Sequence, residues 1–268
     1  MSRTHPAFPL VVLSLFSLCA NAVTVWLAGD STTASRVGSL YVGWGSELQD
    51  FLTIPVQNMA IAGKSLRSFT KDGHFDWMHS LVDEGDIVII EFGNFEGGGP
   101  LGSIRNNVLC PGLDTTVTCE SDDGEVFHTF FKYMEDAARS FKALGAFVII
   151  SSQTPGNPFR YHTETTPVYA LYAKAVAEKT GVAFVDHFSL TRDEYLSLGA
   201  AAVNKMLPSD GIHTTLAGAE VAARSFIKGV LCGGQLNPLY PYVSADARLE
   251  ILRRKGGALC KGSLSLNP

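Results

Sequence analysis

Residues 86–92 read Asp-Ile-Val-Ile-Ile-Glu-Phe, and Gly93 follows them. This short run of β-branched apolar residues lacks polar alternation, which is typical of a strand buried on both faces, as strands of parallel sheets are. Residues 146–151, Ala-Phe-Val-Ile-Ile-Ser, repeat the pattern. Shorter apolar runs give further strand candidates at residues 23–28, 56–61 and 182–185. The chain therefore contains the strands of a mostly parallel sheet.

Helical patterns alternate with these strands. Residues 126–144 place apolar side chains, many of them aromatic, on one helical stripe. Further helical spacing is found at residues 44–52, 166–180 and 216–231. Gly145 and Gly181 stand where the C-terminal caps of two helices belong. The alternation predicts an α/β fold, a flavodoxin-like α/β/α sandwich with a central five-stranded parallel sheet. Ligands of such folds bind beyond the carboxyl ends of the strands.

The composition sets limits on the class of protein. The chain has 268 residues, of which 46% are hydrophobic and 18% are charged, so a disordered chain and a coiled coil are excluded. Its formal net charge of −5 argues against nucleic acid and anionic membranes as partners. No pattern indicates oligomerisation, and we expect a monomer.

The N-terminus has the pattern of a secretory signal peptide. Arg3 precedes an apolar stretch over residues 7–18, and Ala20-Asn21-Ala22 is a small-x-small cleavage site. We expect residues 1–22 to be removed, which leaves residues 23–268 as a single secreted, extracellular domain. The alternative is an uncleaved membrane anchor, although the apolar stretch is too short to span a bilayer.

The cysteines fit an oxidising compartment. Of five cysteines, Cys19 leaves with the predicted signal peptide, and an even number in a secreted chain predicts two disulfides. Sequence proximity favours Cys110–Cys119 and Cys232–Cys260 among the three possible connectivities. Metal binding is the rival interpretation, but no C-x-x-C pair occurs.

Two short segments supply the groups for nucleophilic catalysis. Residues 29–32, Gly-Asp-Ser-Thr, follow the first predicted strand, and residues 210–213, Asp-Gly-Ile-His, precede the last predicted helix. Taken alone, Ser31 is more typical of a turn or helix cap, and Asp-Gly is a common turn signal. Together they offer a serine nucleophile, a His213 base and an Asp210 that orients the imidazole, in an order that recurs among triads. The G-x-S-x-G elbow is absent.

Several ordered motifs resemble the GDSL or SGNH hydrolases, and among them the fungal rhamnogalacturonan acetylesterases. The similar segments cover most of the chain after residue 22. They are residues 24–34 (TVWLAGDSTTA), 56–69 (VQNMAIAGKSLRSF), 87–93 (IVIIEFG), 149–158 (IISSQTPGNP), 185–190 (VDHFSL) and 208–220 (PSDGIHTTLAGAE).

This resemblance implies the SGNH hydrolase fold and hydrolysis of O-acetyl esters on pectic rhamnogalacturonan, without metal or other cofactor. Ser31 would be the nucleophile, His213 the general base and acid, and Asp210 the residue that orients it. The oxyanion would be bound by the N–H groups of Ser31 and Gly63 and by an asparagine side chain.

The sequence departs from the family at that asparagine. The family pattern is G-x-N-D, whereas residues 93–96 read Gly-Asn-Phe-Glu, so Phe95 occupies the donor position. Loss of one oxyanion donor costs about 10²–10³ in kcat, which predicts a slow enzyme. Two alternatives stay open: Asn94 shifts to serve as the donor, or the chain has lost catalysis and only binds glycan. An SGNH esterase or lipase with another ester substrate is a further alternative.

Other residues have less specific interpretations. Lys64 and Arg67 follow the Gly63 segment, and Arg160 lies in another predicted loop. Each of these cations can bind a galacturonate carboxylate of the substrate. The alternative is that they are solvated surface charges. His74 and His79 suggest a metal site or a partly exposed helix, and we expect no metal. His187 either lines the cleft or is structural. The Glu96 carboxyl either acts as an acid or is solvated.

Overall fold

The computed structural model describes residues 22–35, 41–97, 109–121, 123–161 and 163–253. Its central sheet has five parallel strands in the order β2-β1-β3-β6-β7. The strands are β1 (Val25–Gly29), β2 (Val56–Asn58), β3 (Ile87–Glu91), β6 (Phe147–Ser151) and β7 (Ala183–Val185). The predicted five-stranded parallel sheet is therefore confirmed.

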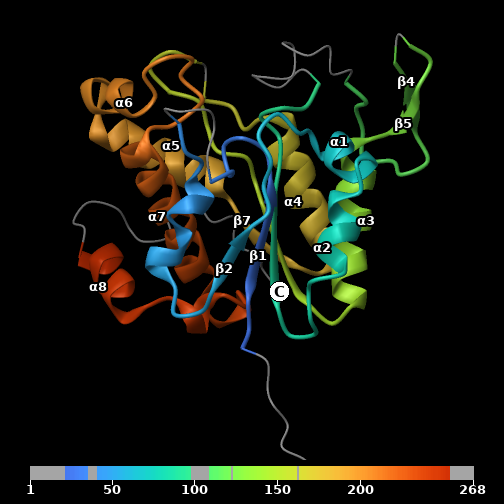
Figure 1. Ribbon diagram of the computed structural model, residues 1–268. Helices are drawn as coiled ribbons and strands as arrows, with labels where there is room; N and C mark the ends of the chain where they lie inside the picture. The colour runs from blue at the N-terminus through green and yellow to red at the C-terminus, as the bar shows by residue number, and fades with distance from the viewer. Residues whose placement is uncertain (1–21, 36–40, 98–108, 122, 162, 254–268) are drawn as a thin grey trace, which may run out of the picture.

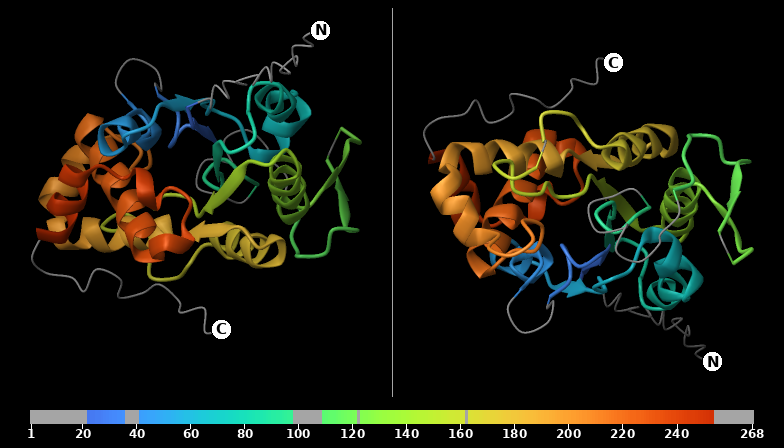
Figure 2. Two further views of the ribbon diagram at one scale, coloured as in Figure 1. Left: turned by 90° about the horizontal axis from the view of Figure 1, so that it is seen from below. Right: turned by 90° about the horizontal axis from the view of Figure 1, so that it is seen from above.

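Helices cover both faces of the sheet, as Figures 1 and 2 show. One face carries α1 (Leu66–Lys71), α2 (His74–His79), α3 (Phe130–Ala143) and α4 (Val168–Thr180). The other carries the short 3₁₀ turns η1 (Trp44–Ser46) and η2 (Leu48–Phe51) together with α7 (Leu216–Gly233). Outside α7 lie α5 (His187–Leu198), α6 (Ala200–Met206) and α8 (Ala245–Arg253), and η4 (Gly234–Leu236) and η5 (Tyr240–Tyr242) follow α7.

The alternation of side chains along the central strands builds the two cores. In β3, Val88 and Ile90 face the core under α1–α4, whereas Ile87 and Ile89 face the core under α7. All five residues of β3 are buried, which explains why its sequence shows no polar alternation.

Two predicted helices differ from the observed elements. Residues 126–128 form β5 (Val126–His128), which pairs in antiparallel fashion with β4 (Thr118–Glu120), and α3 begins only at Phe130. The helix starts there because the Thr129 side chain accepts the N–H of Lys132 and caps it. The predicted helix over residues 44–52 is instead the pair of 3₁₀ turns η1 and η2.

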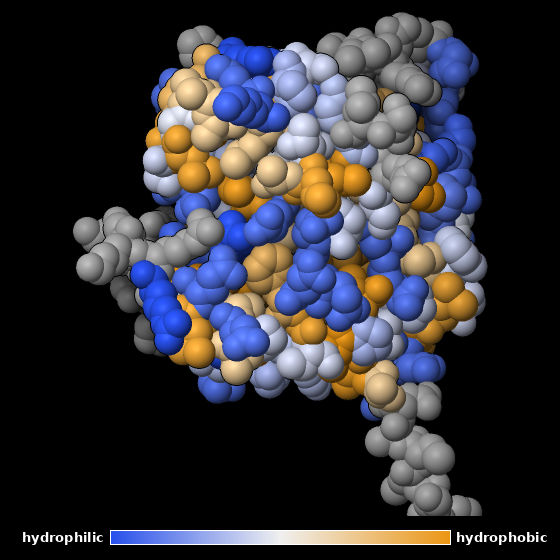
Figure 3. Space-filling model, turned by 60° about the vertical axis from the view of Figure 1, so that its left-hand side comes forward, coloured by the Kyte–Doolittle hydropathy of each residue, from blue (hydrophilic) through white to orange (hydrophobic). Residues whose placement is uncertain are grey.

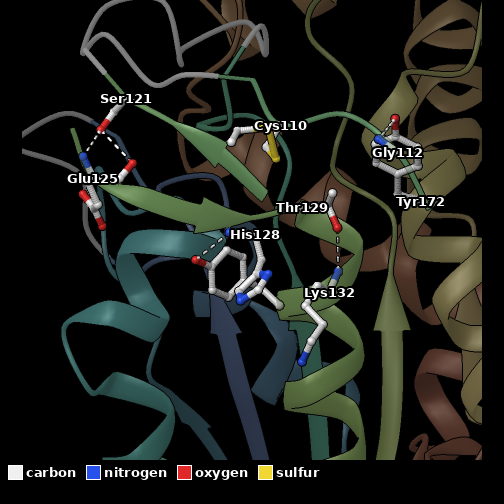
Figure 4. Close-up of a disulfide and its surroundings, with 10 residues drawn as sticks. Cys110, Gly112, Ser121, Glu125, His128, Thr129, Lys132 and Tyr172 are labelled. Atoms are coloured by element: carbon white, nitrogen blue, oxygen red, sulfur yellow. Dashed lines mark hydrogen bonds between the residues drawn. A yellow bond between two sulfur atoms is a disulfide. The ribbon is translucent and has the colours of Figure 1, made fainter. Parts of the chain in front are cut away.

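A disulfide joins Cys110 to Cys119 on β4, as predicted, and Figure 4 shows it beside the hairpin. The N–H of Gly112 donates to the hydroxyl of Tyr172 on α4 at 2.9 Å, which ties the same segment to the body of the domain. Cys232 on α7 is disulfide-bonded, but its predicted partner Cys260 lies outside the described residues. The predicted signal peptide, apart from Ala22, lies outside them too.

The described surface has a mixed character. On the face seen in Figure 3, hydrophobic and hydrophilic residues are interspersed. Within the described part of the chain, no helix is long and apolar enough to cross a membrane.

Candidate active site

Ser31 lies in a tight turn at the carboxyl end of β1. Asp30 shapes this turn, because its Oδ1 accepts the N–H of Thr32 at 2.9 Å and the Thr32 hydroxyl at 2.8 Å. Its Oδ2 accepts the N–H of Asn94, which follows the neighbouring strand β3, at 3.2 Å. Burial raises the pKa of Asp30 to about 6, against the opposing effect of these hydrogen bonds. The turn therefore holds Ser31 between the ends of two central strands.

The structure brings the three predicted triad residues together. His213 Nε2 lies 2.8 Å from Ser31 Oγ, and His213 Nδ1 lies 2.6 Å from Asp210 Oδ2. Ser31 and His213 are 182 positions apart in the chain, and only the fold makes them neighbours. The ring of Tyr41 lies beside that of His213, with the ring centroids 5.9 Å apart.

The local turn fixes both oxygens of Asp210. Oδ1 accepts the backbone N–H groups of Ile212 and His213 at 2.9 Å each, so Oδ2 is left to face the imidazole. Gly211 has φ of +70°, a left-handed conformation that favours glycine, and this explains the Asp-Gly pair. Partial burial alone would raise the pKa of Asp210, but the two N–H groups and His213 outweigh it and lower the pKa. The carboxylate is thus ionised at neutral pH.

Two backbone N–H groups near Ser31 are available to an oxyanion. Among the described residues, neither the N–H of Ser31 nor that of Gly63 has a hydrogen-bond acceptor. Gly63 has φ of +80°, and a Cβ built on it would meet no atom within 4 Å. The space on the Cβ side of Gly63 is therefore open, and its positive φ favours glycine at this position.

The Asn94 side chain is bound within the protein. It is fully buried, and its Nδ2 lies 3.2 Å from the Thr154 carbonyl, 3.3 Å from the Thr154 hydroxyl and 3.4 Å from the Thr32 hydroxyl. Its Oδ1 accepts from Gln153 Nε2 at 3.1 Å. To donate to an oxyanion, Asn94 would have to exchange these contacts. Gln153 and Thr154 belong to residues 149–158, which sequence reasoning singled out by resemblance only, without assigning their roles.

Glu96 and Arg67 point inward instead of into solvent. Glu96 Oε1 accepts the N–H of Leu66 at 2.5 Å, and burial raises the pKa of this carboxyl to about 8. Glu96 is thus protonated at neutral pH and not the solvated carboxylate that was one alternative. The guanidinium of Arg67 lies 4.0 Å from the centroid of the Phe127 ring, and its buried Nη1 has no partner among the described residues. Lys64 pairs with Asp72.

His187 is a buried structural residue and does not line the cleft. Its Nδ1 lies 2.7 Å from Glu91 Oε2 and its Nε2 lies 2.8 Å from the Ala222 carbonyl. Glu91 also accepts from Trp44 Nε1 at 2.7 Å and from Ser151 Oγ at 2.5 Å. This network joins β3, β6 and α7 beneath the Ser31 turn, and hydrophobic periodicity gives no signal for it.

The histidines of α2 have aromatic neighbours. The His74 ring lies 4.9 Å from that of Phe69, and the His79 ring 5.9 Å from that of Phe141. Within the described ranges, no group of three or more His, Cys, Asp or Glu side chains is arranged to hold a metal ion.

Known proteins show the same fold and similar sequences. Residues 27–221 match the model of the GDSL-like Lipase/Acylhydrolase family. The chain is 39% identical over 231 residues to a rhamnogalacturonan acetylesterase of Emericella nidulans, a match that covers 84% of this chain and 92% of that protein.

Two solved structures share the fold at lower identity. The YxiM protein from Bacillus subtilis has a TM-score of 0.65 at 24% identity, over 81% of this chain and 58% of that one. An acetylxylan esterase from Geobacillus stearothermophilus has a TM-score of 0.52 at 19% identity, over 77% of this chain and 93% of that one. By the family model and the Emericella relative, the chain belongs to the GDSL-like lipase/acylhydrolase family.

Proposed function

We propose that this protein is a secreted esterase that removes O-acetyl groups from pectic rhamnogalacturonan through a Ser31-His213-Asp210 triad. The observation that carries the proposal is the continuous hydrogen-bonded line from Asp210 Oδ2 through the His213 ring to Ser31 Oγ, with links of 2.6 and 2.8 Å. The named activity of the Emericella relative supports the substrate class. The signal-peptide pattern of residues 1–22 supports secretion.

Each group has a role set by its neighbours. The ionised Asp210 accepts the Nδ1–H of His213, so Nε2 is left as the acceptor for the Ser31 hydroxyl proton. Ser31 Oγ attacks the ester carbonyl while His213 takes its proton. His213 then gives that proton to the departing sugar oxygen, and an acetyl-enzyme remains. A water molecule, activated by the same Nε2, hydrolyses the acetyl-enzyme and restores Ser31.

The oxyanion site supports a slow enzyme. The N–H groups of Ser31 and Gly63, which have no acceptor among the described residues, supply two donors, but the Phe95 side chain has no polar group at the position of the family asparagine. Asn94 is the candidate third donor, and to donate to the oxyanion it would have to give up its contacts with Thr154. We therefore expect turnover about 10²–10³ below that of a site with three donors, unless Asn94 moves.

The depth of the nucleophile favours a small acyl group. Ser31 is only 3% exposed, so the carbonyl carbon must approach closely between Gly63 and His213. An acetyl group fits this constraint better than a long acyl chain, which distinguishes an acetylesterase from a lipase. Lys64 and Arg67 remain candidate contacts for galacturonate, although Lys64 already pairs with Asp72.

The test is acetate release from acetylated rhamnogalacturonan by the purified protein and by its Ser31→Ala variant. We expect release that the substitution abolishes, and faster hydrolysis of 4-nitrophenyl acetate than of 4-nitrophenyl octanoate. Release that persists in Ser31→Ala would refute the triad. A folded protein that binds the polymer without releasing acetate would favour the impaired glycan-binding alternative.

A further inference from the structure

The loop that carries Asp210 is held by a second loop, residues 157–161, which lies within the connection between β6 and α4. Four consecutive backbone carbonyls, from Pro208 to Gly211, each accept a hydrogen bond from this second loop. Arg160 Nη1 donates to the carbonyls of Pro208 and Ser209 at 3.2 Å each, the Tyr161 hydroxyl to that of Asp210 at 2.5 Å, and the Asn157 N–H to that of Gly211 at 2.7 Å. In Figure 1 the two loops, yellow and orange, lie beside each other above the helices.

Asn157 gives the second loop its shape. It is fully buried, and its Oδ1 accepts the N–H of Phe159 at 2.9 Å, while its own carbonyl accepts the N–H groups of Arg160 and Tyr161 at 3.0 and 2.9 Å. Its Nδ2 donates to Asn204 Oδ1 on α6 at 2.8 Å. These bonds turn the backbone sharply, so that the side chains of Arg160 and Tyr161 reach the Asp210 loop.

The two loops pack closely against each other. A Cβ on Gly211 would lie 2.8 Å from the Tyr161 ring, and one on Gly156 would lie 2.8 Å from the Ile212 side chain. The Asp210 side chain is 40% exposed, and its Oδ1 is held by the backbone N–H groups of Ile212 and His213. Its position therefore depends on the backbone of residues 208–211, which the second loop restrains at every carbonyl.

We propose that Asn157, Arg160 and Tyr161 are positioning residues that hold Asp210 against His213. The proposal rests on the proposed function, since it assumes that Asp210 orients the base. It also gives Arg160 a role other than the substrate contact that its charge suggested. Its Nε donates to Asn204 at 3.2 Å and its Nη1 to two carbonyls, so both atoms already bond to the protein at its surface.

The test uses Tyr161→Phe, which deletes one oxygen, and Arg160→Met, which deletes the donors. With 4-nitrophenyl acetate we expect kcat to fall roughly tenfold for each and KM to stay unchanged, because misplacement of a catalytic group by about 1 Å can cost as much as 10² in rate. Arg160→Lys should recover part of the loss, since it retains a donor. Arg248→Met is the matched control: Arg248 also donates to backbone carbonyls, those of Val243 and Tyr240, but beside α8.

A double-mutant cycle separates positioning from general stability. In an Asp210→Asn background, Tyr161→Phe should lower kcat no further, because the group it positions no longer works. A full additional tenfold loss there would overturn the proposal, as would wild-type kcat in both single variants. A rise in KM on the pectic polymer alone would also overturn it and make Arg160 a substrate contact. In each of these cases Ser31→Ala still abolishes activity if the proposed function holds; activity that survives Ser31→Ala would reject the triad itself.

Discussion

Asp210→Asn should disable the enzyme by reversing the tautomer of His213. Two backbone N–H groups, from Ile212 and His213, point at Asp210 Oδ1 from 2.9 Å. An asparagine must keep its oxygen at that position, because its NH₂ group cannot accept these hydrogen bonds. The NH₂ group is then forced to face His213 Nδ1, which has to become an acceptor.

The consequence is a proton on the wrong nitrogen. With Nδ1 unprotonated, Nε2 carries the hydrogen and cannot accept the proton of the Ser31 hydroxyl 2.8 Å away. A carboxylate-to-amide change with this effect lowers kcat by about 10⁴, or ~5.5 kcal/mol in activation free energy. The fold should be unaffected, because the substitution keeps size and the two hydrogen bonds at Oδ1.

The assay is kcat and KM on 4-nitrophenyl acetate, together with ¹⁵N NMR of the histidine ring to read its tautomer. Asp193→Asn, on the exposed side of α5, is the matched control and should behave as the wild type. A kcat loss below tenfold, or a ring that keeps its proton on Nδ1 in the variant, would refute the reasoning.

Three further predictions follow from the structure. Burial raises the pKa of Glu96 from 4.5 to about 8, so between these pH values the folded protein keeps a proton that the unfolded chain releases. The free energy of unfolding should therefore fall as the pH rises from 4.5 toward 8. Glu96→Gln should flatten this dependence, measured as Tm against pH, and an unchanged slope would contradict the prediction. Phe95→Asn should raise kcat by about 10²–10³, because it restores an amide donor at the position of the family asparagine, and equal kcat in both proteins would contradict this. Replacing Cys110 and Cys119 by serine should destabilise the protein by roughly 2–3 kcal/mol in chemical denaturation and leave kcat intact, since the disulfide joins none of the three triad residues and its segment is tied to Tyr172 on α4. A loss of kcat in the folded variant would contradict this.

Local sequence predicted the parallel sheet and the residues of the proposed triad. The uninterrupted apolar runs of β3 and β6 are typical of strands covered on both faces, and a serine after β1 with Asp-Gly-Ile-His before α7 offers the groups of the proposed triad. These features could be predicted because periodicity and short turns depend on residues close in the chain. The start of α3 could not be predicted in this way, because residues 126–128 form a strand by pairing with β4 and not through their own local pattern.

The tertiary structure decided the surroundings of those groups. Their charge and their position after the Gly63 segment made Lys64 and Arg67 candidates for binding substrate, but the fold pairs Lys64 with Asp72 and stacks Arg67 on Phe127. The roles of Asn157 and Tyr161 depend on two loops about 50 residues apart that meet at the edge of the sheet. The contacts between these two loops depend on how whole helices and strands pack together, and no local sequence pattern encodes that packing. In our proposal, the position of the Asp210 side chain depends on these contacts.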